Sequence, residues 1–140
     1  MRKFNTGNAI VINVAGVCGA AANYLGDNGP ATSALFSGPV GSMVDTLGQV
    51  FVCDLNNNLV RRVNSNSIVA LISGTSAATN SGDDGPASSA SFQTPCGIWF
   101  NSVAFMYVTS KNGFVVRTID SDGIISLFAG KLLSCTAFRY

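Results

Sequence analysis

The 140-residue chain contains no histidine and few charged residues. Charged residues make up 11% of the sequence, and 8 Lys and Arg against 7 Asp and Glu leave a net charge of +1. Without histidine, the usual general base, the usual pH switch and the commonest zinc ligand are all missing. A net charge this small also gives little attraction for nucleic acid or an anionic membrane surface. The composition therefore disfavours histidine-dependent catalysis and nucleic-acid binding.

Cysteine pairs and long apolar runs are also missing. The four cysteines form no CxxC pair, which disfavours a structural zinc site. Two disulfides are an alternative in an oxidising compartment, but four buried free thiols are the favoured interpretation. The cysteines are Cys18, Cys53, Cys96 and Cys135. No apolar run approaches the ~18 residues of a membrane span, so no span is expected.

An internal repeat organises the rest of the chain. The stretch GDNGPATSALFSGPVG at Gly26–Gly41 returns as GDDGPASSASFQTPCG at Gly82–Gly97, an offset of 82 − 26 = 56 residues. Identities continue at the same offset through Arg61 and Arg117. A fixed period of this size marks a repeat architecture. The motif residues are Gly26, Asp27, Gly29, Pro30 and Ala31 in the first copy, and Gly82, Asp83, Gly85, Pro86 and Ala87 in the second.

Each copy opens with a predicted turn and a short helical segment. Gly26–Gly29 is built of residues that tolerate positive φ, and we expect Asp27 to cap its own backbone there. Pro30 is suited to the first helical position, because it has a fixed φ and no N–H to leave unpaired. The helical turn then continues over residues 31–36 and directs Ala34 and Phe36 to the interior.

Four short strands follow in each copy, joined by turns. They are predicted at 40–44, 50–53, 59–63 and 68–72 in the first copy, and at 96–100, 105–108, 114–119 and 124–129 in the second. Several are apolar on consecutive residues, as expected of strands buried on both faces. Four-stranded sheets that bury both faces against copies of themselves are the blades of a β-propeller.

The segment Ile10–Gly16 (IVINVAG) matches the last strand of both copies, Ile68–Gly74 (IVALISG) and Ile124–Gly130 (IISLFAG). The N-terminus also imitates a secretory signal peptide, since a basic start precedes an apolar run and small residues. A segment that occurs three times is better explained as structural. We therefore predict that 10–15 is the outer strand of a preceding blade.

The predicted fold is all-β, a partial propeller of two four-stranded antiparallel blades with one extra N-terminal strand. The expected divisions are a disordered N-terminus at 1–9, an outer strand and loop at 10–25, blade 1 at 26–72, blade 2 with its connection at 73–130, and a tail at 131–140. A closed propeller needs about 4–8 blades. A fragment of a longer propeller is favoured over a ring of several copies.

The order GDxGPAxSAxF, PxG, VFVCD, NNNLVRRV and IVALISG resembles the NHL-repeat propellers, in particular the subtype with a GDGGPA turn found in teneurin-like and microbial proteins. The resemblance covers about residues 10–130. It implies that Asp54 and Asn56 lie in the family's "AD…NN" turn, and that Arg61 and Arg117 are the arginines of its R(I/V)R strand. These four residues are candidate rim or interblade residues.

The second copy departs from this pattern at three positions. Ser110 stands where the first copy has Asp54, Asn101 where it has Asp45, and Ala104 where it has Gly48. These replacements weaken the expectation of any site that needs the original turn residues.

Candidate binding chemistry has a structural alternative in each case. The turn residues Asp27, Asp83 and Asp84 could suggest calcium, but neither turn has the alternating acids and terminal Glu of an EF-hand, so turn capping is favoured. Arg61, Arg62 and Arg117 could form a small basic patch. Because one arginine recurs in each blade, packing and hydrogen bonding between blades is the favoured role. Six strand aromatics could stack bases, but core positions are favoured. They are Phe51, Trp99, Phe100, Phe105, Tyr107 and Phe114.

No catalytic residue, metal or cofactor is expected. The family resemblance implies a non-catalytic scaffold that binds protein or another macromolecule, with other blades of the same chain or further copies as structural partners. The alternatives are a piece of a lyase- or lactonase-like propeller enzyme whose metal ligands lie elsewhere, and an RNA-binding NHL domain, which the low charge disfavours. The Ser-, Thr- and Asn-rich composition slightly favours an extracellular or cell-surface location.

Overall fold

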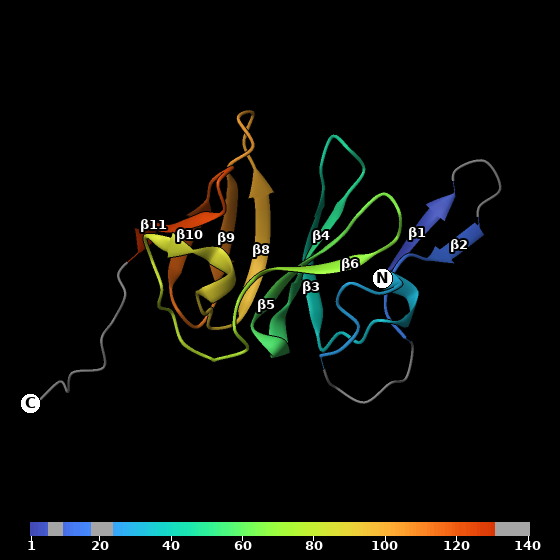
Figure 1. The fold of residues 1–140 in the computed structure, drawn as a ribbon, viewed down its shortest axis with the longest axis horizontal. Helices are drawn as coiled ribbons and strands as arrows, with labels where there is room; N and C mark the ends of the chain where they lie inside the picture. Colours follow the sequence, from blue (N-terminus) through green and yellow to red (C-terminus); the bar gives the residue numbers. More distant parts are fainter. Residues whose placement is uncertain (6–9, 18–23, 131–140) are drawn as a thin grey trace, which may run out of the picture.

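The computed structural model describes residues 1–5, 10–17 and 24–130. Figure 1 shows an all-β molecule in which a small N-terminal hairpin and two larger sheets follow one another in chain order. The predicted class, a partial propeller of two four-stranded antiparallel blades, is confirmed. Within the described residues no helix is long and apolar enough to cross a membrane.

Blade 1 is an antiparallel meander with strand order β3-β4-β5-β6. Its strands are β3 (Pro39–Val44), β4 (Val50–Asp54), β5 (Leu59–Val63) and β6 (Val69–Ser73). All four predicted strands are present, and the predicted helical turn is the 3-10 segment η1 (Ala31–Ser33). A second 3-10 segment, η2 (Leu55–Asn57), joins β4 to β5 and ends at Asn58, whose φ of 57° is left-handed.

Blade 2 repeats the meander and adds one short strand, in the order β7-β11-β10-β9-β8. Its elements are β7 (Gly85–Pro86), η3 (Ala87–Ser89), β8 (Pro95–Phe100), β9 (Met106–Ser110), β10 (Val115–Ile119) and β11 (Ile124–Gly130). In blade 1 the same added pairing is a single bridge between Pro30 and Ile68. The connection before each blade is thus hydrogen-bonded to that blade's last strand.

The N-terminal hairpin consists of β1 (Arg2–Asn5) and β2 (Ile10–Asn13), paired antiparallel. The predicted strand at 10–15 is therefore present as β2. Residues 1–9, which the sequence predicts to be disordered, include β1. The sequence shows no repeat in this segment, and β1 exists because β2 supplies its hydrogen-bonding partner.

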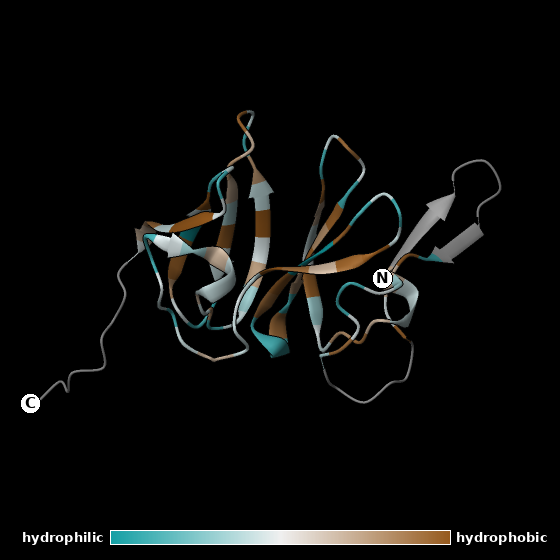
Figure 2. Cartoon of the chain, in the orientation of Figure 1, coloured by the Kyte–Doolittle hydropathy of each residue, from teal (hydrophilic) through white to brown (hydrophobic). Residues whose placement is uncertain are grey.

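The main core lies between the two blades. Phe51 and Val60 of blade 1 pack with residues of β8–β11 and with the alanines of η3 and its end. Figure 2 shows apolar residues along the strands of both blades. The rest of this core is Ala87, Ala90, Phe92, Met106, Val108, Ile119 and Ile125, with Ile72, Ile98 and Phe100 at its edge.

The innermost strands of the two blades approach closely at a glycine. A Cβ atom on Gly41, which has a φ of +40°, would lie 2.1 Å from the carbonyl oxygen of Cys96 in β8. No side chain fits there without moving a backbone. This contact explains the glycine at position 41, whereas at its counterpart Gly97 a Cβ atom would lie 2.7 Å from Thr109 Oγ1 of the same blade.

Candidate functional site

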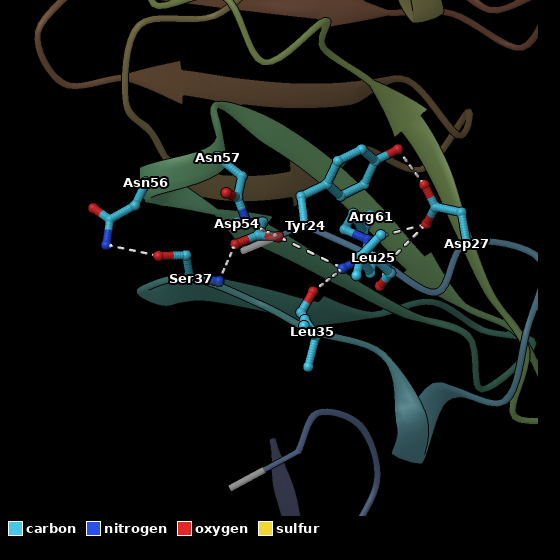
Figure 3. A network of polar contacts seen from close by, with 9 residues as sticks. All are labelled: Tyr24, Leu25, Asp27, Leu35, Ser37, Asp54, Asn56, Asn57 and Arg61. Atoms are coloured by element: carbon cyan, nitrogen blue, oxygen red, sulfur yellow. Dashed lines mark hydrogen bonds and ion pairs between the residues drawn. The ribbon is translucent and has the colours of Figure 1, made fainter. Parts of the chain in front are cut away.

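A buried arginine joins the Gly-Asp turn to the third strand of blade 1. The Arg61 side chain is 0% exposed, and its Nε and Nη2 donate to Asp27 Oδ1 at 3.1 and 2.9 Å. Nη1 also donates to the Leu35 carbonyl, and Nη2 to the Leu25 carbonyl at 3.1 Å. Figure 3 shows the guanidinium enclosed by these oxygens. We call this arrangement the arginine latch.

Two aromatic rings complete the first latch. The Arg61 Cζ atom lies 4.4 Å from the centre of the Phe36 ring and 5.1 Å from that of Tyr24. The Tyr24 hydroxyl donates to Asp27 Oδ2. Burial and the hydrogen bond to Asp27 raise the pKa of Tyr24 to about 12, so this hydroxyl stays protonated at neutral pH.

The second copy builds the same latch 56 residues later. Arg117 is buried, with Nε donating to Asp83 Oδ1 at 2.8 Å, Nη1 to the Ser91 carbonyl at 2.7 Å and Nη2 to the Ser81 carbonyl at 3.0 Å. The ring of Phe92 lies 5.2 Å from its Cζ. Every one of these partners is displaced by 56 residues from its counterpart in the first latch.

The two latches differ where Ser110 replaces Asp54. Asp54 is fully buried, accepts from the Ser37 N–H at 2.7 Å and from Asn57 Nδ2 at 2.9 Å, and lies 3.6 Å from Arg61 Nη1. Burial raises the pKa of Asp54, while these hydrogen bonds and Arg61 oppose that rise. The first latch therefore holds two carboxylates beside one guanidinium.

In the second latch the missing carboxylate is partly replaced. The Gln93 N–H, the counterpart of the Ser37 N–H, donates to Asn80 Oδ1 at 3.2 Å. Asn80 occupies the position that Tyr24 has in the first copy. Ser110 Oγ is buried without a hydrogen-bond partner. The second latch is thus uncharged overall but leaves one buried hydroxyl unsatisfied.

The structure corrects the predicted role of the motif aspartates. Neither η1 nor η3 has a side-chain cap, and the turn is closed by the Gly29 N–H donating to the Gly26 carbonyl at 3.1 Å. Asp27 and Asp83 are instead the counterions of the latch arginines. In the described part of the chain, no group of three or more His, Cys, Asp or Glu residues could hold a metal.

The other motif residues shape the turn around the latch. Gly26 has a φ of +93°, and a Cβ atom there would lie 2.9 Å from Ala34 Cα. Gly82 repeats this contact with Ala90 at 2.8 Å. Pro30 and Pro86 directly precede the 3-10 turns, and the alanines that follow them are buried. Gly85 lies in β7 beside β11.

The predicted rim or interblade residues separate into different roles. Arg61 and Arg117 are buried, so they form no exposed basic patch, and their partners lie in their own repeat unit. Asn56 Nδ2 donates to Ser37 Oγ at 3.3 Å, which ties the β4–β5 loop to the chain before β3. Asn58, which the family resemblance places in the same turn as Asn56, links the two blades: its Oδ1 accepts from the Thr94 N–H at 2.9 Å.

The aromatic prediction is only partly correct. Phe51 is buried, and Phe100 contacts it edge-on with ring centres 4.8 Å apart. Trp99, Phe105 and Phe114 are 65%, 38% and 74% exposed, and so are not core residues. Trp99 occupies the position of Met43, which is half-buried in blade 1, and Phe114 occupies that of Asn58, which bonds to Thr94 of the neighbouring blade.

The two described cysteines are free thiols. Cys53 is buried and Cys96 is half-buried, as the free-thiol interpretation expects for this pair. Burial raises the pKa of the Cys53 thiol to about 12, so it is not a thiolate nucleophile at neutral pH. Cys18 and Cys135 lie outside the described residues.

The turns between the first two strands of each blade form an exposed apolar tip. Asp45 Oδ1 accepts from the N–H groups of Leu47 and Gln49 at 2.9 and 2.8 Å. The side chain of Leu47 at the tip is 74% exposed. Figure 1 shows this loop and its counterpart in blade 2 at the same end of the molecule.

The loop in blade 2 keeps this geometry despite its replaced residues. Asn101 Oδ1 accepts from the N–H groups of Val103 and Phe105 at 3.0 and 2.9 Å. Val103 takes the place of Leu47 and is 66% exposed. Ala104 adopts a φ of 64° at the position of Gly48. The side-chain carbonyl oxygen of an asparagine thus accepts these two hydrogen bonds as a carboxylate does. The turn also tolerates an alanine in place of the glycine.

Comparisons with known proteins extend the fold assignment. No family profile and no curated protein matches the sequence. Two solved structures from Bacteroides thetaiotaomicron are similar. One, a structural genomics protein of unknown function, superposes with a TM-score of 0.68 at 19% identity over 94% of this chain and 30% of its own. The other, described as a "Putative phosphatase", gives 0.63 at 20% identity over 93% of this chain and 30% of its own. The chain thus spans about a third of these structures, and the likeness concerns the fold.

Proposed function

We propose that this chain is a section of an NHL-repeat-type propeller that acts as a non-catalytic scaffold for protein binding. The observation that supports it is the pair of exposed apolar tips, Leu47 and Val103, held in the same turn of both blades. Aliphatic side chains on rigid loops at one end of a repeat scaffold provide anchor contacts for a protein partner, and little conformational entropy is lost when they bind.

The distribution of charge supports the same function. The latch residues Arg61, Arg117, Asp27 and Asp83 are used inside the fold, as is Asp54. The loop tips themselves, residues 45–49 and 101–105, contain no Lys or Arg, the side chains that nucleic-acid phosphates require. A protein surface with a complementary apolar patch is the partner class that these tips fit.

A matched pair of variants tests this function. Leu47→Asn with Val103→Asn removes both tips, whereas Ser65→Ala with Ser121→Ala alters the other turns at the same end. Photo-crosslinking from the purified proteins should give partner capture that falls about tenfold in the first variant and is unchanged in the second, as expected for hot-spot loss. Equal capture by both variants, or turnover of a substrate without any partner, would overturn the proposal.

A further inference from the structure

The chain holds two Asn-Gly pairs, Asn28–Gly29 and Asn112–Gly113, which differ in their hydrogen bonds. An asparagine followed by glycine is especially prone to deamidation, because glycine has no side chain to shield its backbone nitrogen from the asparagine amide. The reaction needs that nitrogen free of its hydrogen bond and the asparagine free to change its backbone angles. The surroundings of each pair therefore decide whether it reacts.

The first pair is held by backbone hydrogen bonds. The Gly29 N–H donates to the Gly26 carbonyl at 3.1 Å, and the Asn28 N–H donates to the Val69 carbonyl at 2.7 Å. The Val69 N–H donates back to the Gly29 carbonyl at 3.0 Å. Attack by the Gly29 nitrogen requires its bond to break and the turn to open, so the fold protects Asn28.

The second pair lies in the loop between β9 and β10 without these constraints. Asn112 is exposed, and within the described residues neither its side chain nor the Gly113 N–H has a hydrogen-bond partner. The equivalent loop of blade 1 is the 3-10 segment η2, in which the Asn58 N–H donates to the Leu55 carbonyl at 3.2 Å. Residues 111–114 form no 3-10 segment. The Gly113 nitrogen is thus available for attack.

Packing in the second latch requires the glycine of this pair. A Cβ atom at Gly113 would lie 2.1 Å from Asn80 Nδ2. The Asn80 side chain is itself fixed, because its Oδ1 accepts from the Gln93 N–H at 3.2 Å. The fold therefore keeps the reactive neighbour of Asn112 in place.

We propose that Asn112 is a site of spontaneous deamidation, with water as the co-reactant. Hydroxide removes the Gly113 amide proton, and the nitrogen attacks Asn112 Cγ. A new N–Cγ bond forms, and the Cγ–Nδ2 bond breaks as ammonia leaves with a proton from water. Water then opens the succinimide ring, at Cγ to give aspartate or at the backbone carbonyl to give isoaspartate. Either product adds one negative charge, and isoaspartate also adds a methylene group to the backbone.

The loop that carries Asn112 holds a strained residue between the blades. Thr94 has a φ of 55°, which is unfavourable for a β-branched residue, at the position of Gly38 in blade 1. The N–H groups of Lys111 and Asn112 donate to the carbonyl and Oγ1 of Thr94, both at 2.9 Å. The Thr94 N–H donates to Asn58 Oδ1 of blade 1 at 2.9 Å. A changed backbone at residue 112 therefore loosens the contact between the blades. This site is separate from the loop tips and does not depend on the proposed scaffold function.

The test measures deamidation in the folded chain by peptide mapping and mass spectrometry, with fragmentation that separates aspartate from isoaspartate. The 140-residue protein is incubated at mildly alkaline pH with and without urea. The ratio of the two rates in urea gives the effect of the local sequence alone. After division by that ratio, residue 112 should deamidate at least about tenfold faster than residue 28 in buffer, which corresponds to ~1.4 kcal/mol. A smaller ratio would overturn the proposal.

Asn112→Gln is the matched control, because glutamine keeps the side-chain amide and the backbone N–H but must close a larger, less favourable ring. Wild-type protein aged until residue 112 is modified should exchange the Thr94 amide hydrogen about tenfold faster than fresh protein. The aged Asn112→Gln variant should exchange it as fresh protein does. Unchanged exchange in aged wild type, or the same acceleration in the variant, would overturn the link between this modification and the blade contact.

Discussion

Removal of the first latch arginine should cost more stability than removal of the second. Arg61→Met leaves two carboxylates without their cation, Asp27 with a side chain 17% exposed and Asp54 with one 0% exposed. Arg117→Met leaves one, Asp83, which is 16% exposed. Breaking a buried ion pair by removing one partner costs about 3–5 kcal/mol. We expect the loss of stability to lie at or below the lower end of this range for Arg117→Met and near the upper end for Arg61→Met.

The measurement is urea unfolding followed by far-UV circular dichroism, with the free energy extrapolated to water. A loss of ~5 kcal/mol approaches the whole stability of many domains, about 5–15 kcal/mol. If Arg61→Met does not fold, Arg61→Lys keeps the charge but not the planar fork and should give an intermediate loss. A loss under about 1 kcal/mol for Arg61→Met, or an equal or larger loss for Arg117→Met, would refute this reasoning.

Three further predictions concern single positions. Because the pKa of Asp54 is raised in the folded state, this carboxyl favours folding most at pH below its unfolded pKa of 3.8 and loses that contribution as pH rises through the folded pKa. The free energy of unfolding of wild type, measured relative to Asp54→Asn, should therefore fall with rising pH. A difference that does not change with pH would contradict this prediction. Gly41→Ala should destabilise by more than ~2 kcal/mol in thermal unfolding, because its Cβ would lie 2.1 Å from a carbonyl oxygen, whereas Gly48→Ala, with nothing within 4 Å, should cost about 1 kcal/mol. Ser110→Ala should be neutral or stabilising in urea unfolding, because the Ser110 hydroxyl is buried without a partner. Ser73→Ala should lose ~1 kcal/mol of stability, because it removes a 2.7 Å hydrogen bond. A larger loss of stability for Ser110→Ala than for Ser73→Ala would count against the assigned hydrogen bonds.

The sequence predicted strands well wherever the repeat was visible. The predicted strand at 59–63 is β5 without any shift, and the one at 50–53 is β4 one residue short. Local apolar runs and turn residues determine these limits, so two aligned copies are enough to locate them. β1 was missed because its pairing partner, not its own composition, makes it a strand.

The role of Asp27 could not be read locally. Aspartate in a glycine turn commonly caps nearby N–H groups, but its actual partner is Arg61, 34 residues later. Asp83 and Arg117 are separated by the same number of residues as Asp27 and Arg61. This repeated pair of identities was the signal in the sequence that the two residues are partners. Only the folded strand order shows that the two positions meet.

Burial of the aromatics depended on what lies beside the sheet. Phe51 and Tyr107 are counterparts, yet Phe51 is covered by blade 2, while the Tyr107 ring packs edge-on against Phe128 of its own blade. A strand pattern reports that a face is apolar. It does not report whether a neighbouring sheet covers that face in this chain.

The latch also defines the module by which such a protein can gain or lose blades. Each arginine binds the turn that precedes its own sheet, so the self-contained piece runs from Tyr24 to Ser73, not from the first strand of one sheet to its last. A duplication cut at Gly74 would carry the arginine together with its aspartate. A cut just before β3 or β8 would separate the two and leave a buried guanidinium in one product and an unpaired carboxylate in the other. Exchange of blades between genes is therefore tolerated at one junction of the repeat and penalised at the other.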